Sequence, residues 1–116
     1  MWVFTDSGFI SAVRPRGDHD NVMVRARDAD SLEVLAKMAG QVIEHSPERD
    51  YPYRITASNE VFAKFLTDNV DFMDYTNFKN QVLATRGKDY AKALGSVWST
   101  MHDVEDYEAR RFIQLS

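Results

Sequence analysis

The feature that most constrains the fold is a change in hydrophobic period near residue 30. In the segment Val22–Arg27, apolar side chains on one side alternate with Met23, Arg25 and Arg27 on the other. A period of two is typical of a strand with one buried face. After residue 30, apolar residues recur mostly three and four positions apart, which is typical of helices. We therefore expect a chain that begins with strands and continues mainly with helices.

Four segments are predicted to be strands. They cover residues 2–5, 9–14, 22–27 and 53–57. Asp6-Ser7-Gly8 has turn chemistry, so the first two strands should form a hairpin. Proline at position 52 is tolerated at the start of the fourth strand because its missing N–H need not join the sheet.

The remaining segments are predicted to be helices, each after a capping residue. Asp30 caps a helix running to about Glu44, where Ser46-Pro47 ends it. Ser58 caps a second helix with an apolar stripe. Asp74 caps a third helix that ends at Gly87, and Asp89 caps a fourth. Trp98 and Met101 of this last helix are expected in a core stripe.

These elements predict an α+β fold. Strands that pair locally favour an antiparallel sheet of about four strands, with helices on one face and additional C-terminal helices. The expected architecture is a two-layer sandwich, loosely ferredoxin-like. One domain over residues 1–116 is the simplest organisation, with residues 105–116 as a frayed charged tail.

Composition excludes several classes of function. The chain lacks cysteine, which excludes disulfides, thiolate metal sites and a cysteine nucleophile. Its net charge of −4 disfavours nonspecific binding to nucleic acid. No apolar run is long enough for a membrane span, and Met1–Thr5 is too short for a signal peptide. We therefore expect a cytoplasmic protein that does not bind membranes.

A basic sheet face is the first candidate binding site. If the apolar residues of strand 22–27 face the helices, Arg25 and Arg27 face away, and Arg54 does so on the fourth strand. Arg14 is expected to join them from the second strand. Guanidinium groups gathered on one face can bind phosphate or the carboxylates of a partner. The alternative is a solvated face neutralised by neighbouring acids.

Two further segments could contact a partner. Tyr51, within Asp50-Tyr51-Pro52-Tyr53-Arg54, would add an aromatic surface beside the arginines, unless this segment only starts a strand. Asn77 and Lys79 would be exposed near a helix start, whose main role is otherwise capping and packing.

Signatures of catalysis are absent from the sequence. The chain has no GxSxG, HExxH, GxxxxGK[ST] or GxGxxG motif. Asp68, Asp71 and Asp74 lack the glycine and terminal glutamate of a calcium loop. We therefore predict no catalytic residue, no metal ligand and no cofactor.

Several segments together resemble a family of small, uncharacterised actinobacterial and actinobacteriophage proteins. They are Met1–Thr5 with Gly8–Val13, Val24–Arg27, Asp50–Arg54, Asp74–Lys79, and Trp98. The likeness spans roughly residues 1–101 and departs at 16–20 and after Met101. The resemblance implies a bacterial or phage origin and a cytoplasmic site of action. Because no activity is established for that family, it implies no catalytic residue.

The leading hypothesis is a non-enzymatic binding protein, phage-encoded, that acts on a host bacterial protein or other macromolecule. Homodimerisation through the open sheet face or an edge strand is compatible with this hypothesis and with the two that follow. The alternative is a regulatory domain that binds a small molecule or nucleotide, which a deep pocket between sheet and helices would favour. A small hydrolase or nuclease ranks third and would need a cleft with convergent acids or histidines.

Overall fold

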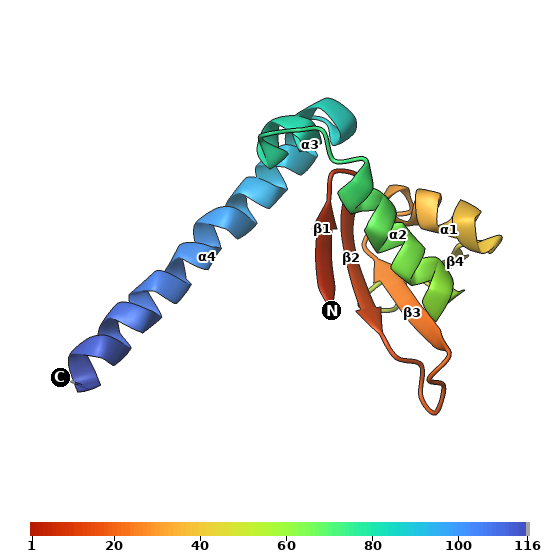
Figure 1. Cartoon of the computed structure of the whole chain (residues 1–116), viewed down its shortest axis with the longest axis horizontal. Coiled ribbons are helices and arrows are strands. Elements are labelled where there is room, and N and C mark those ends of the chain that lie inside the picture. Colours follow the sequence, from red (N-terminus) through yellow and green to blue (C-terminus); the bar gives the residue numbers. More distant parts are fainter. Residues whose placement is uncertain (116) are drawn as a thin grey trace. The chain divides into compact units, whose positions relative to one another are not determined.

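The computed structural model describes the backbone of residues 1–115 and the side chains of residues 1–111. The chain forms two compact units, Met1–Tyr75 and Thr76–Ser116. Unit 1 contains all five strands and the first helices, and unit 2 contains α3 and α4 (Figure 1). The sequence predicted a single domain, with no linker visible between these units.

Unit 1 is built on an antiparallel sheet. Its strands are β1 (Trp2–Thr5), β2 (Gly8–Val13), β3 (Asn21–Ala26), β4 (Glu44–His45) and β5 (Tyr53–Ser58). Their spatial order is β1-β2-β3-β5-β4. The first three strands are neighbours in sequence and in space, as expected for short local connections. Gly8, which closes the β1–β2 turn, has a φ of 150° that favours glycine.

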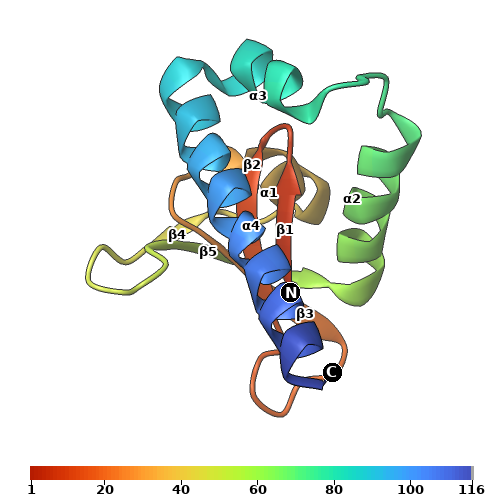
Figure 2. The ribbon, with the colours of Figure 1, turned by 90° about the vertical axis from the view of Figure 1, so that its left-hand side faces the viewer.

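Helices cover one face of this sheet. Figure 1 shows α1 (Glu33–Ala39) and α2 (Asn59–Asp71) on the same side of the strands. Figure 2, turned by 90°, shows β1 and β2 in front of α1. The predicted α+β two-layer architecture is confirmed, including helices on one face of an antiparallel sheet. Three consecutive strands come before the first helix, whereas a ferredoxin-like chain alternates as β-α-β-β-α-β. The fold therefore resembles the ferredoxin-like fold in its two layers but not in its chain order.

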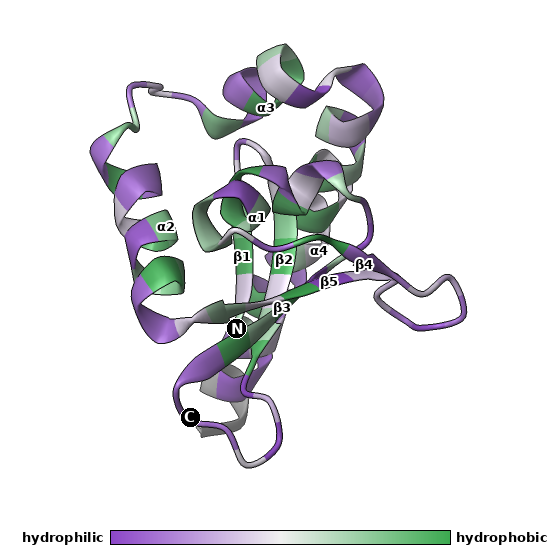
Figure 3. Ribbon diagram, turned by 90° about the vertical axis from the view of Figure 1, so that its right-hand side faces the viewer, coloured by the Kyte–Doolittle hydropathy of each residue, from purple (hydrophilic) through white to green (hydrophobic). Residues whose placement is uncertain are grey.

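The core lies between the sheet and these helices. Val22, Val24 and Ala26 of β3 are buried, as their alternation predicted, and Ile55 and Ala57 of β5 are buried beside them. Leu32, Leu35, Phe62 and Phe65 cover them from the helical side. Figure 3 shows hydrophobic and hydrophilic residues alternating along α1 and α2, which is the pattern of half-buried helices.

The first helical segment differs from its prediction at both ends. Asp30 does not cap it; instead, the Asp28 carboxylate accepts hydrogen bonds from the backbone N–H and the hydroxyl of Ser31. A short 3₁₀ turn (Asp30–Leu32) precedes α1. The helix then ends at Gly40, whose left-handed φ of 62° allows its N–H to bond back to Ala36 and Lys37. The predicted end at Glu44 is therefore wrong, and Val42 is exposed.

Glu44–His45 instead forms β4, an edge strand that periodicity did not predict. Two residues are too few to show a period, so pairing with β5 alone defines this strand. The predicted cap of α2 is confirmed, because the Ser58 hydroxyl accepts a hydrogen bond from the Val61 N–H at 3.2 Å.

Unit 2 is helical. Asn77, not the predicted Asp74, caps α3 (Phe78–Arg86), and its side chain accepts from the Asn80 N–H at 2.9 Å. Asn77 has the extended backbone of a capping residue, which places the helix start three residues later than the sequence suggested. Gly87 ends α3 as predicted, and α4 (Lys88–Leu115) follows immediately.

The last helix also differs from its prediction. It continues through the predicted charged tail from residue 105 as far as Leu115, and Ser116 lies outside the described residues. Val82 and Ala91 are buried where α3 and α4 pack together. Trp98 and Met101 do not occupy a core stripe: they are 70% and 58% exposed. The spacing of the apolar residues predicted the stripe on α4, but it could not show whether another element packs against it.

Candidate functional site

The outer face of the unit 1 sheet carries one continuous row of side chains. Strand pairing places Trp2 opposite Ser11, Ser11 opposite Arg25, Arg25 opposite Arg54, and Arg54 opposite Glu44. The row crosses all five strands in their spatial order. We call these five residues the outer row. Because side chains alternate between faces, these residues lie opposite the apolar core and are not covered by α1 or α2.

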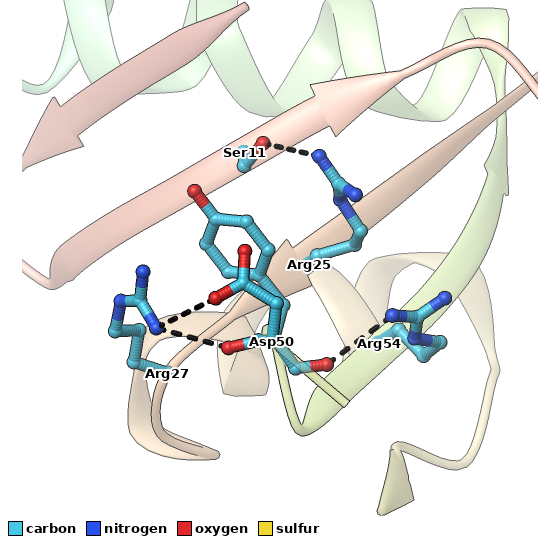
Figure 4. A network of polar contacts seen from close by, with 6 residues as sticks. Ser11, Arg25, Arg27, Asp50 and Arg54 are labelled. Carbon is cyan, nitrogen blue, oxygen red and sulfur yellow. Dashed lines mark hydrogen bonds and ion pairs between the residues drawn. The ribbon is translucent and has the colours of Figure 1, made fainter. Parts of the chain in front are cut away.

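The two central arginines of the outer row are half-buried and lie directly opposite each other on β3 and β5. Arg25 Nη2 donates to the Ser11 hydroxyl at 2.9 Å, whereas Arg54 Nη2 donates to the Tyr51 carbonyl at 3.3 Å. The Nε of each arginine is buried without a hydrogen-bond partner. Figure 4 shows Arg25 pointing to Ser11, with Arg27 and Arg54 on opposite sides of Asp50.

Tyr51 holds the arginine side chains in place. It is only 6% exposed, and the guanidinium carbons of Arg25 and Arg27 lie 4.6 Å and 4.8 Å from its ring centroid. Its carbonyl is the acceptor for Arg54. Arg27 in turn donates to the Asp50 carbonyl at 2.9 Å and forms an exposed ion pair with the Asp50 carboxylate at 3.6 Å. Tyr51 thus organises this surface from below rather than offering its own ring to a partner.

Burial lowers the pKa of Arg54, and the positive charges of Arg49 and Arg25 lower it further. The negative charge of Glu44 acts in the opposite direction. The group still carries its charge at neutral pH because an arginine side chain titrates far above it. The direction of the shift shows that the charged form of Arg54 is not fully compensated by its surroundings.

An aromatic ledge adjoins the arginines and was not identified from the sequence. We define it as Trp2, Phe4 and Phe9. Phe4 stacks on Phe9 with ring centroids 4.6 Å apart, and Trp2 meets Phe9 edge-on at 5.7 Å. Trp2 is 70% exposed and Phe4 is 38% exposed. The signal was present: Trp2 and Phe4 alternate with Val3, and a hairpin places them opposite Ser11 and Phe9.

Arg14 does not lie on this face, and Asn77 and Lys79 are not part of unit 1. The Arg14 guanidinium follows β2 and donates to the carbonyls of His19 and Asn21 and to the Asn59 side chain. It fixes the loop before β3. Residues two apart share a face, so Arg14 has the parity of the buried Ile10 and Ala12, not that of Ser11. Asn77 and the exposed Lys79 belong to unit 2, where Asn77 caps α3.

A cavity of about 160 Å³ lies elsewhere in unit 1, among residues of α1, α2 and the β1–β2 turn. Its apolar lining includes Val34, Met38 and Phe65. Asp6 and Tyr75 also line the cavity. Burial raises the pKa of Tyr75, and the Asp6 charge adds to this shift. Pockets for drug-sized ligands usually measure about 300–1,000 Å³, so this cavity is too small to enclose one.

Replacing Arg54 with methionine is expected to stabilise unit 1 by about 0.5–1 kcal/mol. The change removes a like charge opposite Arg25 and a buried Nε without a partner, at a cost of the hydrogen bond to the Tyr51 carbonyl and the weak one to the Met23 sulfur. Urea denaturation provides the measurement. Arg16→Met, in an exposed loop, is the control and should change stability by less than about 0.5 kcal/mol. A clear loss of stability in Arg54→Met would show that this arginine is retained for the fold.

Histidine and acidic side chains do not gather into a cluster that could hold a metal ion in the part of the chain that the structure describes. His45 stacks on Tyr53 with centroids 4.4 Å apart, and His102 lies 3.0 Å from the Glu105 carboxylate. Over the same residues, no helix combines the length and apolarity needed to cross a bilayer.

Comparison of the chain with models of protein families, with curated proteins and with solved structures finds no match.

Proposed function

We propose that this protein is a non-enzymatic binding protein that contacts a partner protein through the outer sheet face of unit 1. The observation that supports it most is the combination of the aromatic ledge with the half-buried Arg25–Arg54 pair on the sheet face that α1 and α2 leave open. Interface centres are enriched in Trp, Tyr, Phe and Arg, and a few such residues dominate binding energy. Contiguous exposed apolar patches mark interaction sites, and the rings of Trp2, Phe4 and Phe9 lie against one another on this face.

The proposal extends to the protein's setting. A phage-encoded protein acting on a host bacterial protein, in the host cytoplasm, is supported by the resemblance of segments such as Asp50–Arg54 and Asp74–Lys79 to the actinobacteriophage family. A second copy of the chain is the alternative partner, because β1 is an edge strand that could pair with another strand.

The chain offers a matched pair of variants to test this function. Trp2 and Trp98 are both 70% exposed, but only Trp2 lies on the outer sheet face. A host protein captured by the wild type should bind Trp2→Ser at least about tenfold more weakly, as expected for an aromatic hot spot. Trp98→Ser should bind like the wild type.

The binding constants are measured with the purified partner by calorimetry, and sedimentation of the chain alone tests the second-copy alternative. A partner that loses affinity for Trp98→Ser but not for Trp2→Ser would contradict the proposed face. Capture that neither variant affects would contradict it as well.

A further inference from the structure

The central pair of the outer row has an excess of positive charge that unit 1 does not neutralise. Like charges directly opposite each other on paired strands destabilise a sheet. Arg25 and Arg54 are such a pair, and Arg49 adds a further positive charge near Arg54, which the charge of Glu44, opposite Arg54 on β4, offsets only in part. Over residues 1–111, neither Arg25 nor Arg54 lies within ion-pair distance of a carboxylate. Arg27, in contrast, has Asp50.

The hydrogen bonds of the pair leave this charge in place. The acceptors are the Ser11 hydroxyl, the Tyr51 carbonyl and, at 3.6 Å, the Met23 sulfur. All three are neutral, and the thioether is a weak acceptor. Each Nε is buried without a partner. The half-buried guanidiniums therefore donate only to neutral acceptors, with the Glu44 carboxylate beyond ion-pair distance, so an added anion can still form charged hydrogen bonds with them.

We infer, building on the proposed function, that Arg25 and Arg54 together bind one carboxylate of an acidic side chain on the partner protein. A carboxylate has two oxygens that accept from planar guanidiniums, so one group can serve both arginines. It would offset the like-charge repulsion and form a charged hydrogen bond on each strand. The neighbouring aromatic ledge then determines which side chain of the partner lies beside this acidic residue.

The ledge requires a bulky apolar side chain beside that acid. Trp2 lies two strand spacings from Arg25 along the outer row, a separation of about 10 Å. A partner segment that presents Asp or Glu with an apolar residue about 10 Å away would occupy both halves of the face. Such a segment matches the charge of the arginines and the apolar character of the ledge together.

Unit 1 is a poor receptor for a polyanion such as single-stranded nucleic acid. It contains thirteen Asp and Glu but only eight Lys and Arg. Its overall field therefore repels a chain of phosphates, although a single anion can still bind to two arginines that stand opposite each other on paired strands. This charge balance favours one carboxylate within a largely apolar segment.

Panning a random peptide library on the full chain tests this inference. Peptides whose binding requires Trp2 should be enriched in Asp or Glu near bulky apolar residues. Fluorescence polarisation should show about tenfold weaker binding when the acid of a selected peptide becomes Gln or Asn.

The double variant Arg25→Gln/Arg54→Gln should lose this discrimination between the acidic peptide and its amide. Arg25→Lys/Arg54→Lys, which keeps the charges, should retain part of it. Arg27→Gln, whose arginine already has Asp50, should retain it fully.

The outcomes separate the two proposals. The carboxylate site is overturned if the peptides that need Trp2 contain no excess of acids, or if they bind the Gln double variant as well as the wild type. The proposed binding face would still stand in that case. If panning yields no peptide whose binding depends on Trp2 or on the arginines, both the carboxylate site and the binding face are overturned. Tighter arginine-dependent binding of a single-stranded oligonucleotide or of inorganic phosphate would replace the carboxylate by phosphate. Amide spectra that match the wild type establish that each variant is folded.

Discussion

Leu35→Ala is expected to lower the free energy of unfolding of unit 1 by about 2–5 kcal/mol. Leu35 is 0% exposed and lies in the core between α1 and the sheet. Truncation removes buried methyl groups and leaves a cavity that the rigid sheet cannot refill. Since small domains are stable by only about 5–15 kcal/mol, this one change removes a large share of that stability.

The neighbouring residue is the matched control. Val34 also lies on α1 but is 52% exposed, so Val34→Ala should cost less than about 0.5 kcal/mol. Urea denaturation followed by circular dichroism gives the stability. Hydrogen exchange at the Val24 amide, in the middle of β3, assigns the loss to unit 1. Equal losses for the two variants would show that α1 does not face the sheet as described.

Tyr51→Ala should cost about 3 kcal/mol of stability and also disorder the arginine surface. The ring is nearly fully buried, and truncation of a buried aromatic side chain costs about 3–5 kcal/mol. Its loss also removes the contacts to the guanidiniums of Arg25 and Arg27, which contribute about 0.5–1 kcal/mol each at exposed sites. The lower end of the range applies because Arg25 and Arg27 can partly fill the space.

Tyr51→Phe separates packing from polarity. It keeps the ring, so the stability and the arginine signals should stay close to those of the wild type. Urea denaturation measures the first, and the side-chain N–H resonances of Arg25 and Arg27 report the second. If Tyr51→Ala left these resonances unchanged, Tyr51 would not be the residue that positions the arginines.

The candidate site was partly predictable from alternation alone. A period of two in Val22–Arg27 correctly separated the buried valines from Arg25, and the same rule placed Arg54 outward on β5. It failed for Arg14 because that residue follows β2 and has the parity of the core. It also missed the aromatic ledge, since large apolar side chains were assumed to be inside.

Helix ends were predictable only where the deciding residue acts locally. Ser58 and Gly87 act through their own side chain or backbone, and both were predicted. Two other ends lie at Gly40 and Asn77 and not at the residues that the sequence suggested. Ahead of the 3₁₀ turn it is Asp28, not Asp30, that accepts from Ser31. Several residues in each region had suitable chemistry, and the packing of the helix selects which one occupies the terminal position.

The sequence by itself determined the α+β class, the inner and outer faces of β3 and β5, and the absence of familiar catalytic motifs. These follow from residue type and period, which act over a few neighbouring residues. Only the tertiary structure decided that Arg25 and Arg54 stand opposite each other, that Tyr51 lies beneath the guanidiniums and that Trp2 extends the same row. Register joins residues far apart in the chain, and a shift by one residue would place every one of them on the other face.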